Sequence, residues 1–207
     1  MKRLAMTFVS LLIAASLTAS GMPKMPSAPG LTDDQKAVQR YNSGNSHLDR
    51  AAKLEKENAA EAKIRSEYEK AAKDLHTATL LTDRMYQAWT QEGFALRKLG
   101  KYDEALASYD RALTIKPNLS PALEYRAEAY LGLNRLEEAK QTYLLLFTGD
   151  RARADELAAA MKQWVEKRRG EPGTIATETI DAFEKWLSER VQVAVQTSDL
   201  RTPKQSW

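Results

Sequence analysis

The sequence predicts an all-α fold, a short α-solenoid of antiparallel helix pairs that is closed by capping helices at its C-terminal end. Three observations predict it. The strong helix formers Ala, Leu, Glu, Lys, Arg and Gln dominate the chain after residue 31. Alternating runs of Val, Ile and Thr, which would indicate β-strands, are almost absent. Residues 86–151 hold one pattern of small and large apolar residues twice, with a period of thirty-four residues.

The first 21 residues have the composition of a secretory signal peptide. Lys2 and Arg3 precede an uncharged stretch, Leu4 to Ala19, and small residues follow it. This stretch is shorter than the roughly 20 apolar residues that span a bilayer. We therefore expect cleavage after Ser20 or Gly21, which would leave no stable membrane span, and a periplasmic or secreted protein. The alternative is a signal that is retained as a membrane anchor.

The chain contains no cysteine, which excludes a lipoprotein anchor, disulfides and thiolate metal sites. Residues 22–32 include three prolines, and we interpret them as an extended linker between the cleavage site and the folded part. Thr32 or Asp33, supported by Gln35, can cap the first helix.

Residues 33–81 predict two long helices, because Gly44 is almost their only interruption. The second helix carries a stripe at helical spacing, Ile64, Tyr68, Ala71, Leu75 and Ala78. The last four of these align with Tyr102, Ala105, Tyr109 and Ala112 one period later, but the front half of the segment does not align. Residues 33–85 are therefore either an atypical first repeat with lengthened helices or a plain antiparallel hairpin.

Two tandem copies of the repeat, residues 86–119 and 120–150, form the centre of the chain. The first copy consists of Trp89, Gly93, Leu96, Leu99, Gly100, Tyr102, Glu104, Ala105, Tyr109, Ala112 and Pro117. Thirty-four residues later stand Leu123, Ala127, Tyr130, Leu133, Asn134, Leu136, Glu138, Ala139, Tyr143, Leu146 and Arg151. Small residues fit where helices cross closely, and Gly100 and Asn134 can adopt the left-handed conformation that ends a helix.

This pattern resembles the tetratricopeptide repeat, a helix–turn–helix unit that stacks into a solenoid, in the form of an exported bacterial-type protein. The sequence departs from the family at Glu92, where the family prefers Leu. It also departs at Leu146 and Arg151, where the family prefers Ala and Pro, so we expect the second copy to close differently from the first. Such repeats bind proteins or peptides far more often than they catalyse reactions.

After Gly149 the repeat pattern is lost. Two further helical stripes lie within residues 151–195, one from Leu157 to Arg168 and one from Ile175 to Ala194, separated by a Gly- and Pro-containing turn. We interpret them as helices that cap the open end of the solenoid. Residues 196–207 are polar and are predicted to form a flexible tail.

No catalytic, metal or cofactor site can be named from the sequence. His47 and His76 lie on different predicted helices without the spacing of metal ligands. There is no Gly-rich phosphate loop and no nucleophile motif. The 31 basic and 28 acidic residues nearly balance, and acids and bases alternate as on solvated helix faces, so nucleic acid is not an expected partner.

The resemblance implies that the first helix of each repeat lines a concave groove for a protein or peptide partner. The residues outside the packing face of these helices are Gln87, Thr90, Gln91, Phe94, Arg97, Lys98, Glu124, Tyr125 and Glu128, with Leu131 at the end of the second helix. The alternative is that these positions are ordinary solvated ones, with Phe94 half-buried against a neighbouring repeat. Some family members clamp a terminal carboxylate with Lys and Asn on this surface, and Thr90, Phe94, Glu124 and Glu128 do not match that clamp.

These features favour an exported, non-enzymatic scaffold or adaptor that binds a partner through the groove. The alternative is a periplasmic chaperone or an accessory subunit of an envelope complex. An enzyme is the third, less favoured class.

Overall fold

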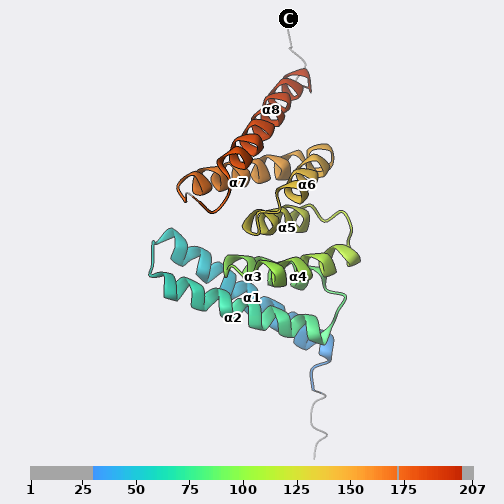
Figure 1. Ribbon diagram of the computed structural model, residues 1–207. Coiled ribbons are helices and arrows are strands. Elements are labelled where there is room, and N and C mark those ends of the chain that lie inside the picture. Colours follow the sequence, from blue (N-terminus) through green and yellow to red (C-terminus); the bar gives the residue numbers. More distant parts are fainter. Residues whose placement is uncertain (1–29, 172, 202–207) are drawn as a thin grey trace, which may run out of the picture. The chain divides into compact units, whose positions relative to one another are not determined.

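The computed structural model describes residues 30–171 and 173–201, with the side chains of 195 and 197–201 left aside. The proposed signal segment, most of the proline-containing linker and residues 202–207 lie outside the described residues. Residues from Leu31 onward form one compact unit. Within the described part the unit is all-α (Figure 1), which confirms the fold class. Its helices are α1 (Asp33–Lys56), α2 (Glu61–Leu81), α3 (Tyr86–Lys98), α4 (Tyr102–Ile115), α5 (Ser120–Gly132), α6 (Leu136–Gly149), α7 (Arg151–Arg169) and α8 (Thr177–Arg201).

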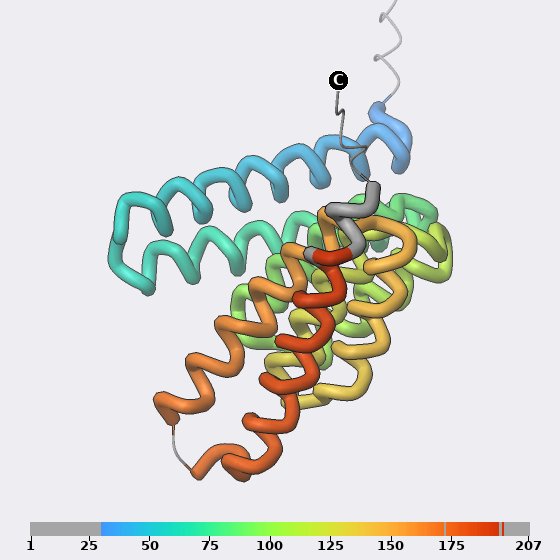
Figure 2. The backbone as a smooth tube through the Cα atoms, turned by 90° about the horizontal axis from the view of Figure 1, so that it is seen from above, coloured from blue at the N-terminus to red at the C-terminus, as the bar shows by residue number. Residues whose placement is uncertain are grey.

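Consecutive helices pack as pairs, and each pair packs against the next. The pairs are α1 with α2, α3 with α4, α5 with α6, and α7 with α8. Figure 2 shows α1 and α2 running side by side, both longer than the helices of the two central pairs. The first helices also contact one another, α3 with α5 and α5 with α7. This arrangement places α1, α3, α5 and α7 along one side of the stack.

Local signals set the helix ends. Thr32 and Gln35 form a capping box, in which each side chain accepts a hydrogen bond from the other residue's backbone N–H. Gly100 and Asn134 have φ values of 77° and 59°, as the pattern predicted. After each of them the chain makes the same bond, from the Lys101 N–H to Leu96 O at 2.9 Å and from the Arg135 N–H to Tyr130 O at 2.8 Å. The two repeats therefore turn in the same way.

The junctions after the two copies differ, as the departures from the family pattern indicated. Four residues separate α4 from α5, whereas only Asp150 stands between α6 and α7. The Asp150 carboxylate caps α7 by accepting from the Arg153 N–H at 3.2 Å. At the far end, α8 continues to Arg201, past the boundary that we predicted at residue 195.

Small residues bring the helices of each pair close together. Ala105, Ala112 and Ala139 have no exposed surface, and neither do the side chains of Tyr109 and Tyr143. A Cβ atom on Gly93 would lie 2.6 Å from the ring of Tyr109, so only glycine fits there without a shift. One core cluster reaches from α3 to α8, and a second holds α1 and α2 against α3.

Candidate binding groove

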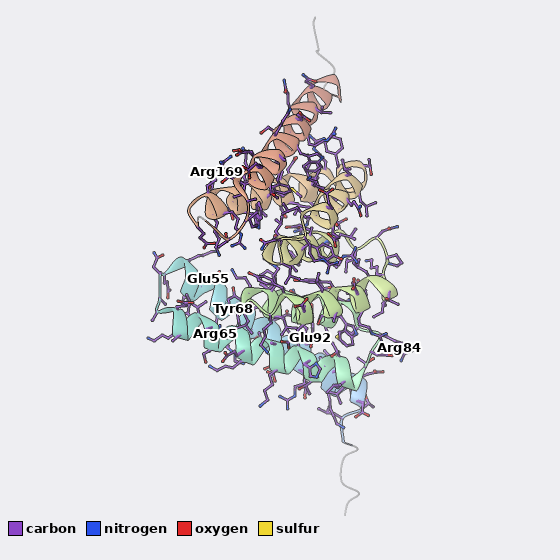
Figure 3. All side chains as sticks on the ribbon, in the orientation of Figure 1. Glu55, Arg65, Tyr68, Arg84, Glu92 and Arg169 are labelled. Atoms are coloured by element: carbon purple, nitrogen blue, oxygen red, sulfur yellow. The ribbon has the colours of Figure 1, made fainter. Side chains whose placement is uncertain are left out.

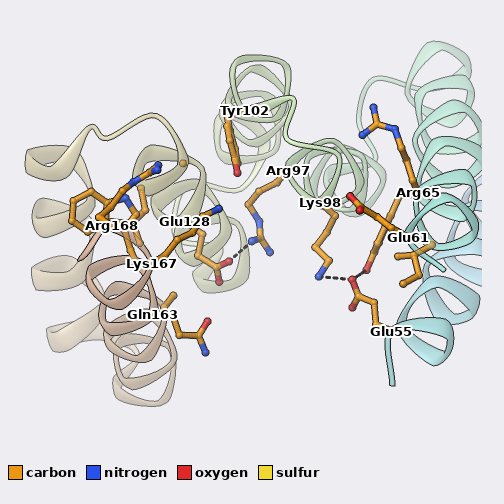
Figure 4. Close-up of a pocket in the computed structure, with 16 residues that line it drawn as sticks. Glu55, Glu61, Arg65, Arg97, Lys98, Tyr102, Glu128, Gln163, Lys167 and Arg168 are labelled. Carbon is orange, nitrogen blue, oxygen red and sulfur yellow. Dashed lines mark hydrogen bonds and ion pairs between the residues drawn. The ribbon is translucent and has the colours of Figure 1, made fainter. Parts of the chain in front are cut away.

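A hollow of about 500 Å³ lies between the first helix pair, α1 and α2, on one side and α7 on the other. We call it the main groove (Figure 4). The end of α1, the first half of α2, the last turn of α3, the start of α4, and α5 and α7 all contribute to it. Its lining consists of Glu55, Glu61, Ile64, Arg65, Tyr68, Arg97, Lys98, Tyr102, Glu128, Leu131, Gly132, Ala160, Gln163, Trp164, Lys167 and Arg168.

Ion pairs hold the floor of the main groove in place. The Arg97 guanidinium donates to the Glu128 carboxylate and thereby joins α3 to α5. Lys98 Nζ lies 2.8 Å from Glu55 Oε1, which also accepts a hydrogen bond from the Tyr68 hydroxyl at 3.0 Å. Dashed lines in Figure 4 mark these contacts. Because they link α1 and α2 to α3, and α3 to α5, they fix the spacing of the helices that line the groove.

Two buried donors in the lining have no hydrogen-bond partner within the described structure. They are Arg168 Nε and the indole Nε1 of Trp164, a residue that is 7% exposed. The Arg97 guanidinium interacts with the Tyr109 hydroxyl as well as with Glu128. A buried donor without an acceptor costs about 1–3 kcal/mol. Acceptors supplied by a bound molecule would remove that cost. The lining also carries more basic than acidic side chains, so the groove suits a ligand that is rich in carbonyl or carboxylate oxygens.

The structure places three of the nine candidate residues, Arg97, Lys98 and Glu128, in the main groove. Gln87 is exposed and Gln91 half-buried, and neither lines it. Thr90 is buried and donates to Tyr86 O at 2.8 Å. Glu124 is buried against α7, where it accepts from Arg153 at 2.6 Å.

Phe94 and Tyr125 are half-buried in a chain of aromatic rings that crosses three helix pairs. The Phe94 ring lies 6.4 Å from that of Tyr68 and 5.2 Å from that of Tyr125, which in turn lies 6.4 Å from the ring of Tyr109. The Arg97 guanidinium sits 5.2 Å from the centre of the Phe94 ring. Phe94 therefore packs against a neighbouring repeat, as in the alternative interpretation of the sequence. The rings of Phe94 and Tyr125 both pack against the Arg97 guanidinium, which lines the groove.

Two walls of the main groove could not be predicted from the sequence. Glu55 belongs to a stretch of alternating charges, which is typical of a solvated helix face. In the groove, however, it accepts a hydrogen bond from Tyr68 and forms an ion pair with Lys98. Lys167 and Arg168 lie in the last turn of α7, where cations suit the helix dipole, and they also line the groove. The Trp164 ring packs 5.2 Å from the ring of Phe183, while its indole N–H has no partner in the described structure. No local sequence signal distinguishes a side chain that lines the groove from one that only packs or is solvated.

Burial changes the acid–base behaviour of Glu124, which joins α5 to α7. Removal from water raises the pKa of this carboxyl to about 7, although the hydrogen bond and charge of Arg153 oppose the shift. The Glu124 side chain is only 4% exposed, and that of Arg153 is 29% exposed. The pair is therefore a largely buried contact between two first helices, and it lies behind the main groove rather than forming the surface of the groove.

Within the described residues, no group of three or more His, Cys, Asp or Glu side chains is placed to hold a metal ion. A search of the same residues finds no helix with the length and apolarity needed to cross a membrane.

Comparison with known proteins identifies the repeat. Residues 86–119 match the tetratricopeptide repeat family. None of the curated proteins that were compared with the chain matches it. The first copy of the pattern is therefore a tetratricopeptide repeat, in a chain whose helices all pack as consecutive pairs.

Solved structures of tetratricopeptide-repeat domains are similar to the chain at low identity. The first such domain of Spaghetti (RPAP3), bound to the HSP90 peptide SRMEEVD, is 20% identical, with a TM-score of 0.47 over 78% of this chain and 97% of that one. The Arabidopsis OM64 domain is 14% identical, with a TM-score of 0.45 over 76% and 98%. The second domain of human RPAP3, in complex with the HSP70 peptide SGPTIEEVD, is 24% identical, with a TM-score of 0.44 over 60% and 97%.

Proposed function

We propose that this chain is a protein-interaction scaffold that holds a segment of a partner protein in the main groove. The observation that carries the proposal is the pair of buried, unpartnered donors on α7, Trp164 Nε1 and Arg168 Nε, which line the groove opposite the paired cations of α3. Stacked helical repeats form extended concave surfaces of this kind and use them for binding. The ion pairs on the floor position the groove before any partner arrives, which lowers the entropy lost on binding.

The lining favours an acceptor-rich segment in an extended conformation. An extended backbone presents its carbonyl oxygens along its length, whereas a helix has already used most of them internally. The cations Arg65 and Lys167 add positive charge to the lining, on α2 and α7. Acidic side chains in the segment would gain charge-assisted hydrogen bonds there.

Filling the main groove should abolish partner capture without unfolding the protein. Ala160 on α7 is half-buried and lines the groove, whereas its neighbour Ala159 is exposed and does not. We expect Ala160→Trp to lose the partner and Ala159→Trp to retain it, with similar melting temperatures. The measurement is affinity capture of the tagged chain from its own cells, quantified by mass spectrometry.

The same experiment separates the function classes. A stable partner in fixed stoichiometry supports a scaffold or an accessory subunit, and a broad set of unfolded clients supports a chaperone. Equal capture by the Ala159→Trp and Ala160→Trp variants would place the binding surface outside the main groove.

We propose further that the chain acts after export, on the basis of the signal-like composition of its first 21 residues. Deletion of residues 2–20 should leave the protein folded and soluble in the cytoplasm, because no disulfide needs an oxidising compartment. Cell fractionation with N-terminal sequencing is the test. A mature protein that begins at Met1 in the membrane fraction would favour a retained anchor.

A further inference from the structure

A second hollow, of about 740 Å³, lies between α2, α3 and α4 and shares no lining residue with the main groove. We call it the side groove. It runs between the second helices of two successive pairs, α2 and α4, with α3 beneath them. Ala72, Trp89, Leu96 and Leu99 provide apolar lining. The Trp89 indole N–H is already bound, to Asp83 O at 2.9 Å, so its ring is held in a fixed orientation.

A buried carboxylate also lines the side groove. Glu92 on α3 (Figure 3) is 5% exposed, and its Oε1 lies 2.8 Å from Nδ1 of His76. Its Oε2 is buried and has no hydrogen-bond partner in the described structure. The Ser108 hydroxyl is close enough to act as a weak hydrogen-bond donor to the Glu92 carboxylate, which lowers the pKa of Glu92 slightly, but the hydroxyl also lies 3.3 Å from Glu104 O and can serve only one acceptor at a time. The net effect of burial is to raise the pKa of Glu92.

This carboxylate is costly for the fold. Position 92 is one at which the tetratricopeptide repeat prefers leucine, and a leucine there would leave no buried oxygen without a donor. A buried polar group that violates the local pattern and is only partly satisfied by its neighbours is expected at functional sites. The free oxygen thus indicates a ligand that brings a hydrogen-bond donor.

We propose that the side groove binds a partner segment in which a basic side chain is flanked by apolar ones, with the basic group donating to Glu92 Oε2. A charged donor is favoured over a neutral one because a nearby cation opposes the effect of burial and lowers the pKa of Glu92, and a charge-assisted hydrogen bond to the resulting carboxylate is about twice as strong. His76 lies at the mouth of the groove with its side chain 56% exposed, so its ring can give way to an entering cation.

The charges on the rim of the side groove do not oppose this partner. Lys101 pairs with Glu104 at 3.3 Å, and Arg111 lies 3.9 Å from Asp83. Lys73 adds a positive charge and Glu69 a negative one. The rim is therefore close to balanced, and the buried carboxylate determines which charge is accepted. Apolar neighbours of the basic residue would cover Leu96 and Leu99, because the Arg111 guanidinium already lies over the Trp89 ring, 5.6 Å from its centre.

The test is a nuclear magnetic resonance titration of the folded chain with two defined peptides. The first is acetyl-Ala-Leu-Arg-Leu-Ala-amide, and the second replaces its arginine with citrulline, which has the same shape and no charge. We expect the arginine peptide to shift the Trp89 indole and the amides around Glu92 saturably. We expect the affinity for the citrulline peptide to be lower by a factor of about ten or more. This factor corresponds to the loss of one charge-assisted hydrogen bond.

Two variants show whether Glu92 is responsible. Glu92→Leu should abolish binding of the arginine peptide and melt at a higher temperature than the native chain, and Glu92→Gln should bind it about tenfold more weakly. Ala160→Trp, which fills the main groove, should bind it normally, so the two sites are tested separately. Equal binding of both peptides, no saturable shift, shifts confined to the main groove, or full binding by Glu92→Leu would overturn the proposal.

Discussion

Replacing Ala105 or Ala139 with tryptophan is expected to unfold the protein at room temperature. These alanines are equivalent positions of the two central repeats, and neither has any exposed surface. The helices of each pair leave no space for an indole, because Tyr109 and Tyr143 already fill the core beside them. Overpacking by smaller groups costs about 1–3 kcal/mol, and an indole exceeds that within a total stability of about 5–15 kcal/mol.

Circular dichroism during thermal or urea unfolding measures this effect. Ala107→Trp is the matched control, since Ala107 lies on the same helix as Ala105 but is exposed. It should unfold almost as the native chain does. Native-like melting of Ala105→Trp and Ala139→Trp would show that the repeat register assigned to α4 and α6 is wrong.

Removing the Arg153 side chain should destabilise the protein by about 3 kcal/mol above neutral pH, because it leaves the buried Glu124 carboxylate without its cation. Burial already raises the pKa of Glu124 to about 7 in the native chain. A group with a raised pKa in the folded state favours folding at low pH, and that contribution is lost as the pH rises through the folded value. Because Arg153 opposes the rise in the pKa of Glu124, Arg153→Ala should raise this pKa further, so the variant should continue to lose stability above about pH 7, where the native chain no longer does.

Urea unfolding at pH 5.5 and pH 8.5 tests the direction of this pH dependence. The free energy of unfolding of Arg153→Ala should differ little from that of the native chain at the lower pH and should be much smaller at the higher pH. Glu156→Ala removes the other, exposed carboxylate partner of Arg153, and it should change stability by less than about 1 kcal/mol at either pH. A difference that is independent of pH would mean that Glu124 is not the group responsible.

The fold could be predicted because it depends on local, repeated signals. Helical spacing marks each element, and the left-handed residues Gly100 and Asn134 mark equivalent turns. The fully buried Ala105 and Ala139 recur at the same distance as the turns do. Each of these signals acts within one helix or one pair, so a single sequence contains them.

The groove could be predicted only in part because it depends on contacts between pairs. Arg97, Lys98 and Glu128 project from the helices on which a binding surface was expected. Glu124, from the same surface, is instead covered by Arg153 of α7. The sequence predicted only a capping role for α7, whereas α7 packs beside α5 as a further first helix. That packing buries Glu124 and adds Trp164 and Arg168 to the groove.

Site-specific photo-cross-linking in living cells tests the central claim, that the main groove holds a partner protein, most directly. A photoreactive residue is placed at Gln163, which is exposed and lines the groove, and in a second strain at Lys162, its exposed neighbour outside the groove. We expect irradiation to yield a discrete cross-linked species from position 163 that is absent from position 162. Cross-linking at position 162 alone, at both positions equally, or at neither would contradict the claim.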